Sequence, residues 1–307
     1  NDDGTTVDSG KNIGMIAKTT TTIPNSTFVQ TFKYDAINRL TEAKEFNPTT
    51  PTTNNWIQTF DYDRFGNRIQ FNQTVGGTTL PTTTTTKPTI DSSNNRFTTG
   101  QGYQYDFNGN LIQDAEGRTF TFDGNDKQIE VKETNAPVGQ PSIGRYFYDA
   151  SGARVKKVTN LETTIFVYDA GGALAAEYST QTAPTNPTTS YMTTDHLGSP
   201  RVITDKNGNV ISRRDFLPFG EEIGVDTVQT SNRSNNPQYA TTDKVRQKYT
   251  GYQKDEETKL DFAEARMYQN KHGRFTAVDP LMSSASPTNP QTFNRYAYTG
   301  NNPVNNI

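Results

Sequence analysis

The sequence contains no cysteine and two histidines, His196 and His272, among its 307 residues. Disulfides and thiolate metal ligands are therefore excluded, and two imidazoles are too few for most zinc sites. No apolar run approaches the roughly 20 residues that a membrane-spanning helix needs. The net charge is −3 with both signs interspersed, so the basic face of a nucleic-acid-binding protein is also missing. We expect no cofactor, no metal, no nucleic acid and no membrane span.

Hydrophobic residues are also scarce. They make up 31% of the chain, and the mean hydropathy is −0.83. Aromatic residues nevertheless reach 11%, a class that disordered chains lack, and large rings at alternate positions can build a core where aliphatic side chains are few. The composition therefore favours a folded chain. A start at Asn1 without methionine and an abrupt end at Ile307 predict a piece of a longer protein.

A motif of two alternate aromatic residues followed by aspartate recurs through the first part of the chain. Two aromatics two positions apart lie on one face of a strand, the aspartate starts a turn, and a glycine such as Gly109 supplies a positive φ. Each copy therefore predicts a β-hairpin, and because one hairpin is only marginally stable, the copies must stack. The copies are FKYDAINRL (32–40), FDYDRFGNRI (60–69), YQYDFNGNLI (103–112), FTFDGNDKQI (120–129), YFYDASGARV (146–155) and FVYDAGGALA (166–175).

Two stretches rich in threonine and proline, residues 47–55 and 74–89, interrupt the array. This composition favours extended, solvated segments, so we interpret them as exposed loops between strands. A glycosylated or adhesive segment is the alternative. Asn25, Asn72 and Asn232 stand in Asn-x-Ser/Thr sequons, which carry little weight in a chain this rich in serine and threonine.

From Tyr191 onward, recognisable motifs follow one another with shorter gaps between them. DHLGSPR (195–201) is followed by Asp205-Lys-Asn-Gly208, a strong hairpin signal between the expected strands 202–204 and 210–212, and the polar stretch 225–242 reads as a loop. From Tyr249 to Asn302, aromatic and polar residues alternate between glycines, as in half-buried strands joined by turns.

Five motifs follow one another in an order that resembles the Rhs/YD-repeat proteins and their repeat-associated core. They are the repeated aromatic–aspartate motif, DHLGSPR, TGYQKDEETKLDFAEARMY, GRFTAVDP and NRYAYTGNNPVN. This bacterial family includes the C subunits of Tc toxins and is similar to teneurins. The resemblance implies an all-β fold in which stacked hairpins form a spiral, solenoid-like shell wall with a C-terminal closing segment. We expect the repeat array over residues 1–190 and the core-associated segment over 191–307.

The resemblance also implies a function, that of a container wall holding or presenting a toxin or other cargo domain C-terminal to it. A secretion-system or cell-surface partner and a secreted or cell-surface location in bacteria would follow. Two alternatives stay open. One is an aspartate-dependent autoprotease that releases the cargo, and the other is an adhesive or filament-forming protein that self-associates through free sheet edges.

Other candidate polar residues have simpler structural explanations. Asp195 and His196 are neighbours, and on a strand they would point to opposite faces, so an acid–base pair is not expected. His272, beside Gly273, is expected in a turn. The charged run 254–257 is interpreted as a solvated hairpin tip.

Glu264 and Arg266 lie two apart and are expected as a buried pair on one face of a strand.

Asp279 is the candidate catalytic residue. It matches the aspartate of the family motif G-R-F-x-x-x-D-P, which self-cleaving relatives use with a second aspartate shortly downstream. Such a dyad needs two carboxylates that share a proton. No Asp or Glu occurs between Pro280 and Ile307, so the partner is absent or lies outside the chain. The simpler role for Asp279 is that of a turn carboxylate before proline.

Overall fold

The computed structural model describes residues 14–81, 83–133, 142–181, 189–224, 245–281 and 285–306, together with residues 233, 236, 239 and 243. Its strands pair antiparallel in five sheets, which confirms the all-β prediction. Within the described part, no helix has the length and apolar character needed to cross a membrane.

The first two large sheets follow the order of the chain, because each strand pairs with the next. The six-stranded sheet consists of β1 (Lys18–Ile23), β2 (Ser26–Tyr34), β3 (Leu40–Phe46), β4 (Asn54–Tyr62), β5 (Arg68–Val75) and β6 (Thr78–Thr79). The eight-stranded sheet consists of β9 (Gln104–Tyr105), β10 (Leu111–Gln113), β11 (Arg118–Phe122), β12 (Gln128–Glu133), β13 (Gly144–Tyr148), β14 (Arg154–Thr159), β15 (Thr163–Tyr168) and β16 (Leu174–Ser179). A two-stranded ribbon lies between them in sequence, β7 (Ile90–Asp91) with β8 (Arg96–Phe97).

The C-terminal part forms two smaller sheets and several 3-10 turns. The three-stranded sheet consists of β17 (Ser190–Thr194), β18 (Pro200–Asp205) and β19 (Val210–Arg213). The four-stranded sheet consists of β20 (Gln253–Asp255), β21 (Leu260–Ala263), β22 (Arg266–Gln269) and β23 (Arg274–Phe275). The 3-10 turns with described bounds are η3 (Tyr249–Gly251), η4 (Asn270–His272), η6 (Pro290–Phe293) and η7 (Thr299–Asn301).

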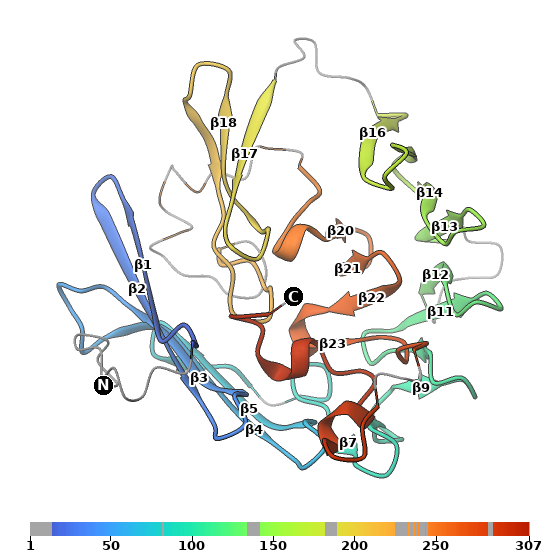
Figure 1. Cartoon of the computed structure of the whole chain (residues 1–307), viewed down its shortest axis with the longest axis horizontal. Helices are drawn as coiled ribbons and strands as arrows, with labels where there is room; N and C mark the ends of the chain where they lie inside the picture. The colour runs from blue at the N-terminus through green and yellow to red at the C-terminus, as the bar shows by residue number, and fades with distance from the viewer. Residues whose placement is uncertain are drawn as a thin grey trace.

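The arrangement is a curved wall around a closing segment (Figure 1). Strands β1–β5 lie along one side, β9–β16 rise along the other, and β20–β23 lie inside the curve together with the C-terminal end. We call β1–β16 the wall and residues 245–306 the closing segment. The predicted division at residue 190 stays a prediction, and the packing described below unites residues from both of its sides.

The predicted hairpin turns are confirmed, and each rests on its aspartate. Asp149 Oδ1 accepts hydrogen bonds from the backbone N–H groups of Ser151, at 2.9 Å, and Ala153, at 3.0 Å. Gly152 adopts a φ of +85°, which L-residues with a side chain resist. The first and fourth copies lack glycine at this position and place Asn38 and Asp126 there, with φ of 67° and 59°. The local turn chemistry therefore tolerates small polar residues.

The tyrosine of the motif links successive hairpins. The Tyr62 hydroxyl donates to the Leu40 carbonyl at 2.7 Å, and Leu40 begins the return strand of the preceding hairpin. The same bond recurs from Tyr168 to Arg154, the first residue of β14, at 2.9 Å. The aspartate thus closes its own turn, whereas the tyrosine joins its hairpin to the one before.

The first threonine- and proline-rich stretch lies at the surface, as predicted, whereas the second matches the predicted loop only in part, because Thr74 and Val75 end β5 and pair with β6. Residues 48–53 are exposed between β3 and β4. In the second stretch, β6 is a short exposed edge strand, and the described residues after it form a loop of exposed and half-buried residues in which Pro88 is buried. This loop is fastened to the body, because the Thr84 carbonyl accepts from the Tyr103 hydroxyl and the Thr85 carbonyl lies 3.0 Å from His272 Nε2. Asn232 and most of the predicted loop 225–242 lie outside the described residues.

Candidate functional site

The concave face of the wall is buried against the C-terminal part of the chain, and we call this contact the seam. Its core consists of two hydrophobic clusters, each drawing aromatic and aliphatic side chains from both sides. The first contains Phe32, Leu40, Ala43, Trp56 and Phe60 of the wall and Phe216, Leu217, Phe219, Ile223, Tyr249, Tyr268, Tyr298 and Val304. The second contains Phe97, Tyr103, Leu111, Phe120, Val131 and Tyr146 of the wall and Leu260, Phe262 and Met267 of the closing segment. Neither part would keep its apolar face from water without the other.

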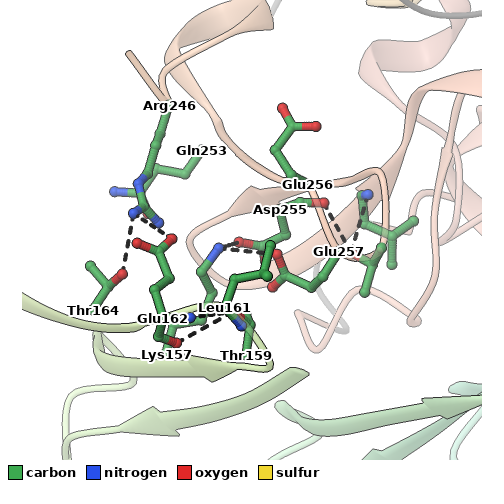
Figure 2. A network of polar contacts seen from close by, with 12 residues as sticks. Lys157, Thr159, Leu161, Glu162, Thr164, Arg246, Gln253, Asp255, Glu256 and Glu257 are labelled. Carbon is green, nitrogen blue, oxygen red and sulfur yellow. Dashed lines mark hydrogen bonds and ion pairs between the residues drawn. The ribbon is translucent and has the colours of Figure 1, made fainter. Parts of the chain in front are cut away.

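An ion network crosses the seam beside the second cluster. Arg154 Nη1 lies 2.6 Å from Asp255 Oδ2, and Lys157 Nζ lies 3.0 Å from Asp255 Oδ1. Lys157 Nζ also lies 3.2 Å from Glu257 Oε2, and the Tyr146 hydroxyl donates to Glu257 Oε1 at 2.9 Å. Figure 2 shows Lys157 pointing between the two carboxylates. Two cations of β14 are thus matched to two acids, Asp255 at the end of β20 and Glu257 in the turn that follows it.

Burial decides the electrostatics of this network. The side chains of Arg154, Lys157 and Asp255 are 1%, 3% and 0% exposed. Burial and the neighbouring Asp255 carboxylate raise the pKa of Glu257. Burial alone would lower the pKa of Arg154, but the Asp255 charge and hydrogen bond outweigh it and raise that pKa. Removing one partner would leave a buried charge without compensation, which is far more costly than losing a surface pair.

This network corrects the prediction that residues 254–257 form a solvated hairpin tip. Lys254 and Asp255 are buried, whereas the side chains of Glu256 and Lys259 are 64% exposed. Only the outer side of the turn therefore matches the prediction. The partners of Asp255 come from β14, about a hundred residues earlier, so the local charge pattern does not reveal the burial.

A second network ties the wall to the DHLGSPR region. Arg233 binds both carboxylate oxygens of Glu45 in β3, at 2.9 and 2.8 Å, and also contacts Asp215 at 2.7 Å. Asp215 pairs in addition with Arg201 and accepts from the Tyr239 hydroxyl at 2.6 Å. Burial opposes ionisation of Asp215, but the charges of Arg201 and Arg233 and the Tyr239 bond outweigh it and lower its pKa to about 2.

Sequence analysis missed Arg233 and Tyr239 altogether. Both lie in the stretch 225–242, which was interpreted as a polar loop, yet Arg233 is 1% exposed and Tyr239 9% exposed. Arg233 also lies over the Phe28 ring, 3.4 Å from its centroid. An arginine and a tyrosine inside an Asn- and Ser-rich stretch were the available signal, because long side chains of this kind often anchor a loop to the body.

Asp279 lines a cleft of about 370 Å³, together with Asn289, Arg295 and Asn306 among others. Its Oδ1 accepts from the Leu281 N–H at 2.9 Å, and its Oδ2 lies 3.5 Å from Arg266 Nη2. Asp279 contributes the one carboxylate among the described residues that line the cleft.

The predicted buried pair of Glu264 and Arg266 is wrong. Residues 260–269 do not form one strand, because β21 ends at Ala263 and β22 begins at Arg266. Glu264 therefore stands exposed in the tight turn between them, with a φ of 56°. Arg266 instead stacks over the Phe275 ring, 3.7 Å from its centroid.

Both histidines bond to backbone carbonyls. His196 does not lie on a strand with Asp195, as was assumed, but in the turn between β17 and β18, where its Nε2 lies 2.9 Å from the Val304 carbonyl oxygen. His272 is in a turn, as predicted, and it is buried. Burial and the Arg68 charge keep the pKa of His272 well below its usual range.

The fold and the seam define the chain as part of a YD shell, and three comparisons agree. A family model described as the teneurin YD-shell matches residues 159–304. The tRNA nuclease WapA of Bacillus subtilis (strain 168) is 30% identical over 272 residues, which cover 81% of this chain and 10% of the relative. Salivary gland surface protein 1 of Aedes aegypti is 30% identical over 191 residues, covering 52% of this chain and 5% of the relative. This chain thus spans about a tenth of WapA.

Solved structures show the same fold. The Tc holotoxin pore of Photorhabdus luminescens, which includes TccC3, aligns with a TM-score of 0.67 at 18% identity, covering 91% of this chain and 15% of that chain. A TcdB2–TccC3 crystal structure aligns equally well, with a TM-score of 0.67, 18% identity, and coverage of 91% of this chain and 16% of that chain. The chain belongs to the Rhs/YD-repeat family.

Proposed function

We propose that this chain is the part of a toxin-type shell in which the wall folds over its own closing segment. In this role it encapsulates a cargo domain that lies C-terminal to it, and holds or presents that domain. The observation that carries the proposal is the seam. Both hydrophobic clusters and both ion networks join the wall to residues 201–304. Such a contact fixes the curvature of the wall and so favours an enclosing rather than an extended form.

The relatives support a role beside a toxic activity rather than that activity itself. WapA is named a tRNA nuclease, but this chain matches only 10% of its length. The chain has a net charge of −3, which does not suit a nuclease that must hold an RNA backbone. We infer that any nuclease or other toxin is a separate cargo domain. We further infer a secreted or cell-surface location, with a secretion-system or cell-surface partner.

Protease protection tests this proposal. The chain would be expressed with its natural flanking sequence, if the gene encodes any, and a small protease-sensitive reporter as C-terminal cargo. We expect the reporter to be digested far more slowly than the same reporter alone. The Asp255→Ala variant should restore digestion, whereas Asp205→Ala, in an exposed turn, should not. Circular dichroism would verify that both variants keep their β-structure, and equal digestion of the enclosed and free reporter would contradict encapsulation.

Cleavage dependent on Asp279 is the second candidate function. The observation that favours it is that Asp279 and Asn306 line one cleft, which would bring the backbone near Asn306 close to the carboxylate. We expect no efficient cleavage, because a dyad mechanism needs a second carboxylate and the described lining residues supply none. Intact mass followed over days is the measurement. Quantitative cleavage that Asp279→Asn abolishes would make the protein an autoprotease.

A further inference from the structure

The sheet edges of the described chain differ in how they are guarded. Edge strands expose unpaired backbone groups, and charged residues are a common means of preventing contact with another chain. β1 begins with Lys18, and β16 carries Glu177, which pairs with Arg246 at 3.2 Å. β20 is buried along its whole length.

β17 has no such protection. It is the outer strand of the three-stranded sheet, all five of its residues are exposed, and it contains no charged residue, proline or glycine. Tyr191 and Met192 are 57% and 50% exposed, and because they are neighbours on a strand, each face of β17 carries a large apolar side chain. In Figure 1 the ribbon of β17 and β18 rises from the rest of the molecule, with β17 on the side of the ribbon nearer β16.

We propose that β17 is the interface for a second copy of this chain, which pairs with it antiparallel across a two-fold axis at Met192. The sequence SYMTT suits this register. Ser190 would face Thr194 of the other copy, and Tyr191 would face Thr193 of the other copy. Hydroxyl pairs and aromatic–β-branched pairs are both favourable across antiparallel strands, and the absence of charge avoids repulsion.

The symmetry limits the size of the assembly. A two-fold contact uses the same strand on both copies, so pairing consumes the edge and stops at a dimer. The result joins two three-stranded sheets into one six-stranded sheet. This outcome differs from the filament that an adhesive protein would form, because a filament needs two different edges on each copy.

Cysteine cross-linking tests the register, and the natural absence of cysteine gives a clean background. Directly opposed residues of antiparallel strands lie about 4.5 to 5.5 Å apart between Cα atoms, within disulfide range. We expect Met192→Cys to form a disulfide-linked dimer at least about tenfold faster than Tyr191→Cys, whose diagonal separation is too long. Val210→Cys, on β19 of the same ribbon, is the exposed control. Equal rates for the three variants would overturn the proposal.

Sedimentation of the cysteine-free chain provides a second measurement. We expect a concentration-dependent monomer–dimer equilibrium with no larger species. Met192→Lys places two like charges opposite one another at the axis and should weaken the dimer at least about tenfold, while Val210→Lys should leave it unchanged. A chain that stays monomeric at all concentrations, or a dimer that survives Met192→Lys, rules out pairing through β17.

Discussion

Carboxylates stabilise both the hairpin turns of the wall and the seam, but the partners that they bind lie at very different distances along the sequence. In a turn, the Asp149 carboxylate binds N–H groups two and four residues ahead of it. In the seam, Arg154 and Asp255 are 101 residues apart, and Arg233 and Glu45 are 188 apart. A turn can therefore form as soon as its own residues are present, whereas the seam exists only when the whole chain is folded. The comparison predicts that seam residues matter more for stability than turn residues.

The largest expected effect comes from breaking the buried network. Asp255→Ala should lower the free energy of unfolding by about 3–5 kcal/mol, because Arg154 and Lys157 stay buried without their shared carboxylate. Asp149→Ala, in an exposed turn, should cost about 1 kcal/mol. Urea denaturation of both variants is the measurement. Equal losses would show that the seam is no more important than a single turn.

The second network makes the fold sensitive to acid. The pKa of Asp215 is lowered to about 2 in the folded chain, below its ordinary value of 3.8. The folded state therefore binds fewer protons than the unfolded state over this range. The associated stability, about 2–3 kcal/mol, is complete above pH 4 and is lost as the pH falls towards 2.

Chemical denaturation between pH 5 and pH 2 would measure this loss. Tyr239→Phe removes a hydrogen bond that lowers the pKa of Asp215, so in this variant the loss of stability should be smaller and should be complete at a higher pH. An unchanged pH profile would mean that Asp215 is not the group responsible.

A turn can be broken as well, at lower cost. Gly208 has a φ of +83°, so Gly208→Val forces a β-branched residue into a strained conformation and should cost about 1–3 kcal/mol. Ser212→Ala, in the adjoining strand, should be nearly neutral, since the Ser212 hydroxyl is buried without a partner in the described part of the chain. Thermal midpoints of the two variants distinguish these expectations, and equal midpoints would remove the turn assignment.

The smallest effect concerns the contact between hairpins. Tyr62→Phe keeps the ring but removes the bond to the Leu40 carbonyl, which should cost about 1 kcal/mol. Tyr178→Phe is the matched control, because Tyr178 is 65% exposed, and it should leave stability unchanged. Calorimetry that finds no difference between the two would show that the tyrosine acts through its ring alone.

The sequence was most informative wherever a feature depends on neighbouring residues. The hairpins, their aspartate turns and the positive φ at Gly208 all follow from stretches of about ten residues, and all are present. The motif order from Asp195 onward identified the family correctly. Sequence reasoning failed at Glu264, where a tight turn interrupts what reads as one alternating strand. Alternation alone does not show where a strand reverses.

The candidate site divides in the same way. That Asp279 precedes a proline and accepts a local N–H could be expected from the sequence, whereas its arginine neighbours could not. The charged run at 254–257 looked solvated because charged residues usually are. Asp255 is buried nevertheless, because its positively charged partners lie on β14, a strand distant in the sequence.

By itself, therefore, the sequence determined that the chain forms antiparallel hairpins with aspartate-centred turns and aromatic faces. These outcomes depend on backbone geometry and hydrogen bonds within a few residues. Only the tertiary structure decided that the concave face is filled by the closing segment, and that Arg154 meets Asp255 and Arg233 meets Glu45. The physical reason is that a buried charged side chain is stable only when an opposite charge lies beside it. The curvature of the whole wall decides which residues come close enough to form such pairs.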